Sequence, residues 1–103
     1  MTVNLQSNEK FLVEKTPANL FKGLEAVGGH LTITDKRLIF KAHKFNIQGG
    51  ITEINLSDIV SVTKANTLKI IPNRIIVKTK DGNKHKFVVY KRDKLVQLIT
   101  EHL

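Results

Sequence analysis

Cysteine is absent from the 103 residues of this chain. Without thiols the chain has no disulfide bridge, no thiolate metal ligand and no cysteine nucleophile. No stretch approaches the roughly 20 apolar residues of a membrane-spanning helix, and the N-terminus lacks the basic start and apolar run of a signal peptide. Hydrophobic residues make up 41% and charged residues 25%, as in folded globular proteins. We therefore expect one folded domain in a reducing, cytoplasmic compartment.

Recognisable catalytic and metal-binding patterns are also lacking. The histidines, which have no metal-ligand spacing, are His30, His43, His85 and His102. We expect His85 and His102 to be partly buried and the other two to lie on the surface. Gly28–Gly29 and Gly49–Gly50 lack the spacing of a phosphate-binding loop, and Ser57–Asp58 has no nucleophile elbow. These absences predict a non-catalytic protein with no cofactor and no metal.

Acidic residues are scarce in the C-terminal part of the chain. The formal net charge is +8, from 17 basic and 9 acidic residues. Residues 1–63 hold seven basic and six acidic groups, whereas residues 64–103 hold ten basic groups and three acids. The positive excess therefore belongs to the C-terminal part. It favours an anionic partner, but it does not indicate which fold the chain adopts.

The stretch from Gly28 to Phe40 predicts a β-hairpin. Asp35 and Lys36 fit a two-residue turn, because aspartate tolerates the left-handed conformation that such a turn needs. Side chains alternate between the two faces of a strand, so the turn also fixes the register. The expected core face carries two opposed pairs, Ile33 with Leu38 and Leu31 with Phe40. The other face carries Thr32, Thr34, Arg37, Ile39 and Lys41.

The last hairpin permits two registers around Asp81–Gly82. A two-residue loop mixes apolar and charged side chains on both faces, whereas a three-residue loop with Gly82 in the left-handed position separates them. We choose the three-residue loop, because a register is fixed wherever one face is buried. It places Ile75, Val77, Thr79, His85, Phe87 and Val89 on one face and Arg74, Ile76, Lys78, Lys84, Lys86 and Val88 on the other. It also sets Lys78 opposite Lys84, a mildly destabilising like-charge pair unless an anion binds there.

The N-terminal third is less regular. Residues 1–9 are either a loose arm or an irregular lead-in, and residues 11–13 form either an edge strand or a helical turn. Pro17 interrupts this region, because proline removes a ladder donor. Residues 19–27 predict a strand that ends in a turn at Gly28–Gly29.

The middle of the chain alternates short strands and turns. Residues 45–50 predict a loop with two permissive glycines, and residues 65–71 are either a strand extension or a loop that buries Leu68 and Ile70. Strands are predicted for residues 52–56, with Ile54 and Leu56 facing inward, and for residues 59–64, with a turn at Ser57–Asp58 between them.

The spacing of apolar residues changes after Lys91. Leu95, Leu98, Ile99 and His102 lie three and four residues apart, and Val96 and Leu103 widen the stripe. This periodicity predicts an amphipathic helix over residues 91–103 that packs one face on a sheet. The residues alone therefore predict a mainly β, antiparallel domain with one C-terminal α-helix.

The order of these motifs resembles the GRAM domain, a branch of the pleckstrin-homology-like superfold. The stretch from Leu31 to Phe40 is similar to the family pattern L-x-L-T-N-x-R-L-I-F. The other matching motifs are Pro17-Ala18-Asn19, Glu25, Gly28-Gly29, Ile54-Asn55-Leu56-Ser57-Asp58-Ile59, Ile71-Pro72-Asn73 and Lys80-Asp81-Gly82. The resemblance covers about residues 11–103, which we take as the domain, with residues 1–10 as an N-terminal arm. It implies a seven-stranded, sharply bent antiparallel barrel closed at one end by the helix.

Families of this superfold bind phosphoinositides, other anionic lipids or peptides, so the resemblance implies a binding module. Lipid-binding members present a long basic loop between the first two strands. This chain has only residues 26–30 there, which counts against specific recognition of an inositol phosphate.

The strongest candidate site is the basic face of the last hairpin. Its residues are Arg74, Lys78, Lys84 and Lys86, extended by Lys91, Arg92 and Lys94. Each cation near an anionic leaflet contributes about 1 kcal/mol, so about four to six support weak peripheral attachment. The outer face of a sheet is also charged simply because it is solvated. The absence of an interleaved acid favours a partner, either anionic lipid headgroups at the cytoplasmic membrane face or a protein.

Nucleic acid is a third class of partner. The sequence pI of about 9.9 suits phosphate contacts, but single-strand binding also needs exposed aromatic platforms. Phe40 and Phe87 fall on expected core faces, and only Phe45 lies in an expected loop. We therefore rank nucleic acid below membrane or protein partners. We also expect the apolar stripe of the helix to pack on the core rather than to mediate oligomerisation.

Overall fold

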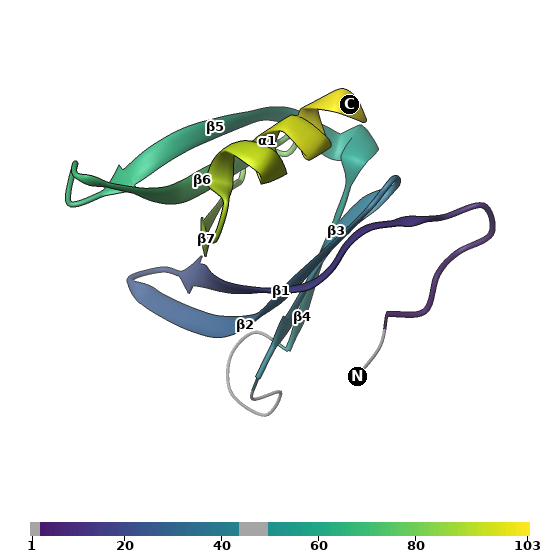
Figure 1. The fold of residues 1–103 in the computed structure, drawn as a ribbon, viewed down its shortest axis with the longest axis horizontal. Helices are drawn as coiled ribbons and strands as arrows, with labels where there is room; N and C mark the ends of the chain where they lie inside the picture. Colours follow the sequence, from purple (N-terminus) through teal and green to yellow (C-terminus); the bar gives the residue numbers. More distant parts are fainter. Residues whose placement is uncertain (1–2, 44–49) are drawn as a thin grey trace.

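The computed structural model describes residues 3–43 and 50–103, which form one strongly curled antiparallel sheet with a helix packed against it (Figure 1). The sheet order is β4-β3-β2-β1-β7-β6-β5, so β4 and β5 are its edges. The strands are β1 (Phe11–Lys22), β2 (Glu25–Thr34), β3 (Arg37–Ala42), β4 (Ile51–Asn55), β5 (Ile59–Thr67), β6 (Ile71–Thr79) and β7 (Lys84–Val89). A 3₁₀ helix, η1 (Leu56–Asp58), joins β4 to β5, and the helix α1 (Arg92–Glu101) follows β7. This architecture confirms the predicted fold class, and η1 replaces the turn expected at Ser57–Asp58.

The hairpin of β2 and β3 has the predicted register. Ile33 lies opposite Leu38 and Leu31 lies opposite Phe40, and all four side chains are at most 1% exposed. Asp35 and Lys36 separate the two strands. The alternation of apolar residues therefore predicted both the pairing and the core face correctly.

The opposite face of this hairpin is buried as well, which the sequence did not predict. Thr34, Arg37 and Ile39 are all buried. The N-terminal segment contacts two of them, because the Glu9 carboxylate accepts hydrogen bonds from Thr34 and Arg37. Residues 3–10 have no regular secondary structure, so the irregular lead-in is the correct alternative. The segment is attached by reciprocal hydrogen bonds: the Lys10 backbone N–H donates to Asp35 Oδ1 (2.9 Å), and the Asp35 N–H donates to the Lys10 carbonyl (3.1 Å).

The turn predicted at Gly28–Gly29 is wrong. The chain reverses instead at Gly23 and Leu24, and both predicted turn glycines lie inside β2, opposite Asn19 and Ala18. A Cβ at Gly29 would lie 2.8 Å from Phe40 Cζ and would overlap the Lys41 carbonyl, so this glycine permits close packing rather than a turn. The loop between the first two strands is thus even shorter than residues 26–30.

Pro17 lies within β1 instead of interrupting it. It pairs with His30 on one side, while pairing of β1 with β7 begins only at Ala18. Proline is tolerated where a strand has one neighbour, because its missing N–H then breaks no ladder bond. Residues 11–13 were predicted as either an edge strand or a helical turn, and the strand is correct. They form the start of β1, before its pairing with β7 begins.

The hairpin of β6 and β7 also has the predicted register. Val77 lies opposite His85, Ile75 lies opposite Phe87, and Gly82 has a φ of +89°. The Thr79 N–H donates to the Asn83 carbonyl at 3.0 Å and closes the loop. The three-residue loop therefore sorts the side chains into a buried face and a basic face, as expected.

The hairpin of β5 and β6 is longer than predicted. The strand β5 extends to Thr67, so the strand extension is the correct alternative for residues 65–71. Burial of Leu68 and Ile70 is wrong, because these side chains are 81% and 80% exposed. A loop was predicted at residues 45–50. All of these residues except Gly50 lie outside the described part of the chain.

The helix closes the core on the side of β5 and β6 (Figure 1). Leu95 and Ile99 are buried among the sheet residues, and Val96 packs at their margin. The helix is shorter than the predicted range, and His102 is exposed rather than partly buried. Its Nδ1 lies 2.9 Å from the Leu98 carbonyl, so the imidazole folds back on the helix end instead of entering the core.

Candidate functional site

The predicted basic residues lie in two groups rather than one. Lys78, Lys84 and Lys86 lie towards the turn between β6 and β7. Arg74 lies towards the other end of β6, about 13 Å further along at roughly 3.3 Å per residue. The residues around the start of α1, which lie beside Pro72 at that same end of β6, are Lys91, Arg92 and Lys94.

The turn end of the basic face has three exposed lysines. Lys78 and Lys84 are directly opposed, and Lys86 lies opposite Ile76 on the same outer face. The acid closest in sequence is Asp81, whose carboxylate accepts hydrogen bonds from the Thr79 hydroxyl and from the Asn83 N–H. These hydrogen bonds, the one from Thr79 foremost, lower the pKa of Asp81. Its charge therefore persists at neutral pH but is engaged within the turn.

A different hollow behind this turn is acidic. Glu53, Asp58 and Asp81 line it together with Lys80 and His85, and its volume is about 340 Å³. Burial lowers the pKa of His85, which favours its neutral form. Three carboxylates beside one lysine repel an anionic ligand, so the outer face rather than this hollow is the anion-attracting side of the turn.

Arg74 is held in place by the sheet. Its guanidinium carbon lies 4.7 Å from the centroid of the Phe21 ring, a cation–π distance, and its Nε donates to Thr67 Oγ1 at 3.0 Å. A fixed planar guanidinium suits phosphate recognition, because little side-chain entropy is lost on binding.

The start of α1 combines one fixed cation with two exposed ones. Arg92 Nη1 donates to the Ala65 carbonyl and to Asn66 Oδ1, both at 2.9 Å, so this residue ties the helix to β5. Asp93 is paired with Lys64 at 2.7 Å, which lowers the pKa of the aspartate. Lys91 and Lys94 are exposed and remain the available cations here.

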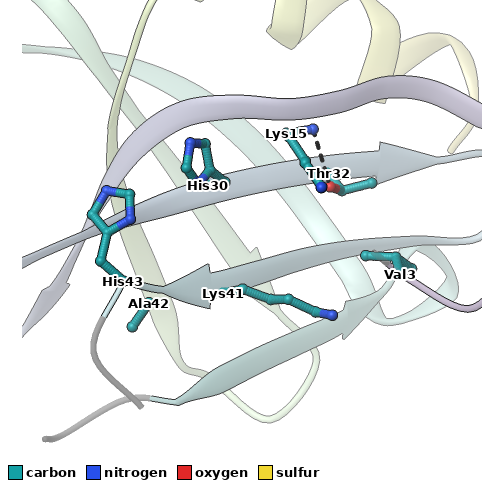
Figure 2. A pocket seen from close by; sticks show the side chains of 7 residues that line it. All are labelled: Val3, Lys15, His30, Thr32, Lys41, Ala42 and His43. Atoms are coloured by element: carbon teal, nitrogen blue, oxygen red, sulfur yellow. Dashed lines mark hydrogen bonds between the residues drawn. The ribbon is translucent and has the colours of Figure 1, made fainter. Parts of the chain in front are cut away.

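A cationic hollow lies on the outer face of β1, β2 and β3, and sequence reasoning missed it (Figure 2). Its volume is about 250 Å³, and its lining is Val3, Lys15, His30, Thr32, Lys41, Ala42 and His43. The Lys15 N–H donates to Thr32 Oγ1 at 3.2 Å, and the two imidazoles meet edge to face at 4.9 Å. The described residues of this lining supply donors and no carboxylate, which suits an anion. His43 is exposed as predicted, whereas His30 is half-buried.

This hollow had a partial signal in the sequence. Thr32 and Lys41 were correctly assigned to one face of the hairpin. Continuing the alternation by two residues adds His30, which lies opposite Lys41. The misplaced turn at Gly28–Gly29 ended that face too early.

Within residues 3–43 and 50–103, no three histidine or carboxylate side chains are arranged so that they could hold a metal ion. None of the helices in that part of the chain is long and apolar enough to cross a bilayer.

Solved structures with the same fold are distant in sequence. The C-terminal domain of an unknown protein from Leishmania infantum has a TM-score of 0.77 at 21% identity, covering 93% of this chain and 85% of that one. The Vps36 N-terminal PH domain has a TM-score of 0.75 at 19% identity, with 96% and 82% covered. The linker-DH/PH structure of p115-RhoGEF has a TM-score of 0.70 at 15% identity; the match covers 94% of this chain and 30% of that one. Such identities show the fold alone.

No match is found among curated proteins. The family comparison is decisive, because the GRAM domain profile matches residues 2–103 and thus nearly the whole chain. GRAM and PH-like domains are generally non-catalytic modules that bind membranes or proteins. With its sheet order, its helix and this match, the chain belongs to the GRAM domain family.

Proposed function

We propose that this chain is a non-catalytic module that attaches peripherally to anionic lipid at the cytoplasmic face of a membrane. The observation that carries the proposal is the outer face of β6 and β7. Arg74, Lys78, Lys84 and Lys86 share this face, and neither strand contains an acid. Each cation near an anionic surface contributes about 1 kcal/mol, so the face supports reversible attachment without a closed headgroup pocket.

The opposed lysines support the same proposal. Lys78 and Lys84 face each other across two strands, where an opposite charge would stabilise the sheet. An anion placed between them supplies that charge. A surface selected only for solubility gains nothing from this arrangement, whereas a phosphate-binding surface does.

Vesicle co-sedimentation tests the proposal. We expect more protein to sediment with phosphatidylcholine vesicles that contain phosphatidylserine than with phosphatidylcholine alone, and the excess to fall as salt is raised. The double variant Lys84→Gln/Lys86→Gln should bind less than the matched variant Lys10→Gln/Lys36→Gln, although both lose the same charge. Equal sedimentation with both kinds of vesicle at low salt would overturn the proposal.

A protein partner is the second candidate, and a specific groove favours it. Pro17, Val88, Ile71 and Tyr90 contribute to an open hollow of about 510 Å³ on the outer face of the sheet. A peptide with apolar side chains fits such a surface, and its binding would persist at high salt. The variant Val88→Lys would abolish peptide binding while strengthening attraction to anionic vesicles, which separates the two candidates.

Nucleic acid has less support. Among the aromatic residues that the structure describes, Phe40 and Phe87 are buried, Phe11 and Phe21 are half-buried, and only Tyr90 is exposed. Phe45 lies outside the described residues. A single platform is insufficient for the stacking that single-strand binding uses. Retardation of random oligonucleotides with a steep salt dependence would reverse this ranking.

A further inference from the structure

The turn between β5 and β6 exposes two large aliphatic side chains. Leu68 is 81% and Ile70 is 80% exposed. The turn is the outermost point of the fold at the left of Figure 1. Ile71 and Tyr90, which are 48% and 68% exposed, line one hollow next to it. We call Leu68, Ile70, Ile71 and Tyr90 the apolar tip.

The backbone of this turn is unfavourable for its residues. Leu68 has a φ of +52° and Lys69 a φ of +64°, and the Ile70 N–H donates to the Thr67 carbonyl at 3.1 Å. Positive φ at both central positions is the requirement of a type I′ turn, which strongly prefers Asn-Gly. Leu68 is therefore costly in two respects, since it is solvent-exposed and has a left-handed backbone. Packing within the described fold offsets neither cost, which is the situation of residues retained for a partner.

Three lysines lie in or beside the segment that carries the apolar tip. Lys69 is in the turn itself, and Lys91 and Lys94 lie beside Pro72, the residue that follows Ile71. Asp93 is the one acid in that hollow, and Lys64 pairs with it at 2.7 Å. Apolar side chains with nearby lysines match the boundary of an anionic leaflet, where lipid phosphates lie just above the acyl chains.

We infer that the apolar tip inserts Leu68 and Ile70 into the headgroup–acyl boundary of an anionic membrane, while Lys69, Lys91 and Lys94 contact the lipid phosphates. The inference rests on the proposed function and adds to it the segment that enters the bilayer. The cations of β6 and β7 then contribute attraction that salt screens, and the apolar tip contributes attachment that persists in salt.

Fluorescence tests the insertion directly, because the chain contains no tryptophan. The reporter Leu68→Trp places the only indole at the apolar tip, and Val60→Trp places one at an exposed site near the start of β5, away from the turn. With vesicles of phosphatidylcholine and phosphatidylserine, we expect emission from the first reporter to shift to shorter wavelength. Lipids brominated on the acyl chain should quench the first reporter and leave the second unquenched.

A loss-of-binding variant provides the second measurement. Leu68→Asn/Ile70→Ser preserves the turn, because asparagine tolerates a left-handed backbone. Removing two inserted aliphatic side chains should lower vesicle affinity by at least about tenfold. The matched variant Val60→Asn should bind as the parent does.

The outcomes separate the two proposals. If the parent chain binds anionic vesicles but the Leu68→Trp reporter is not quenched and the Leu68→Asn/Ile70→Ser variant still binds, the insertion is overturned and surface attachment stands. If the parent binds no anionic vesicle, both are overturned. A blue shift of the same reporter that depends on protein concentration without lipid would show that a second copy covers the tip, and would also overturn insertion.

Discussion

Glu9 and Arg37 form a buried ion pair that joins the irregular N-terminal segment to the outer face of β3. Arg37 Nε lies 2.7 Å from Glu9 Oε2, and Nη2 donates to Oε1 at 2.9 Å. The Glu9 side chain is fully buried and that of Arg37 is 9% exposed. Thr34 donates its hydroxyl proton to the same carboxylate at 2.6 Å, and Arg37 also donates to the Asn4 carbonyl. The two parallel hydrogen bonds between the Arg37 guanidinium and the Glu9 carboxylate hold the N-terminal segment on the sheet.

We predict that Glu9→Ala lowers the free energy of unfolding by about 3 kcal/mol, the lower end of the range for breaking a buried pair. Arg37 keeps a second partner, Glu53 at 3.1 Å, which limits the loss. Urea denaturation measures the change. The exposed acid Glu14 is the control, and Glu14→Ala should shift the stability by less than about 0.5 kcal/mol. Equal effects of the two substitutions would show that the pair does not stabilise the fold.

The same pair predicts a dependence of stability on pH. Hydrogen bonding from Arg37 is the main cause that lowers the pKa of Glu9 from 4.5 to about 2. Because the folded pKa is depressed, the stabilisation is complete above pH 4.5 and is lost as the pH falls through that value towards 2. The difference in unfolding free energy between the parent and Glu9→Ala should therefore shrink across this window. A difference that is constant with pH would contradict the prediction.

Gly29 and its neighbour Gly28 should respond differently to alanine. A Cβ at Gly29 meets backbone atoms of β3, including Ala42 Cα at 2.9 Å, and Gly29→Ala should destabilise the fold by about 3 kcal/mol or more. Among the described residues, a Cβ at Gly28 meets only the side chains of Asn19, at 3.2 Å, and His43, at 3.5 Å, both of which can move. Thermal unfolding should show a large loss for Gly29→Ala and a small change for Gly28→Ala. The opposite order would refute the close-packing role.

Removing one of the opposed lysines should affect stability and binding in opposite directions. Lys78→Gln relieves its repulsion from Lys84 and should raise the free energy of unfolding by about 0.5 kcal/mol. The same substitution should weaken binding to phosphatidylserine vesicles about fivefold, the equivalent of about 1 kcal/mol. Lys10→Gln, which removes an exposed charge elsewhere, should change neither quantity as much. A parallel fall in both would indicate a purely structural role for Lys78.

Relieving the strained turn should stabilise the protein at the expense of membrane attachment. The variant Leu68→Asn/Lys69→Gly places the preferred residues at both positive φ positions and should raise the free energy of unfolding by about 1–2 kcal/mol. Vesicle binding by this variant should fall at the same time, because it removes an inserted leucine and a lysine. Denaturation and co-sedimentation of one preparation measure both effects. Unchanged vesicle binding would show that the turn does not contact the membrane.

The turn and the register of two hairpins could be predicted from the sequence. Their turns, Asp35-Lys36 and Lys80-Asp81-Gly82, lie between strands with strict two-residue alternation, and only one register places the apolar set on one face. The glycine pair at positions 28 and 29 misled the prediction, because the sequence does not distinguish a glycine needed for a turn from one needed for close packing. Phe40, whose ring occupies the space over Gly29, decides between these uses.

The sequence predicted the basic residues as one candidate site, and the structure separates them into two groups. Lys78 and Lys84 were correctly paired, because their opposition follows from the register. The grouping of Lys91 and Lys94 with Pro72 depends on where the helix packs, which local spacing does not specify. The cationic hollow of Figure 2 was missed partly for the same reason, since Val3 reaches it from the N-terminal segment. It was also missed because the turn misplaced at Gly28–Gly29 left His30 off the predicted face.

The sequence by itself determined the strand-rich fold class, the two register-defining hairpins and the basic character of the C-terminal part, because these properties depend on local periodicity and charge. The tertiary structure alone decided that the second face of β2 and β3 is buried and that Leu68 is exposed. The burial of Arg37 requires Glu9, 28 residues away, and the exposure of Leu68 follows from the length of a hairpin that extends beyond the core. The first depends on a contact between segments far apart in the chain and the second on where the packed core ends, and no local pattern encodes either.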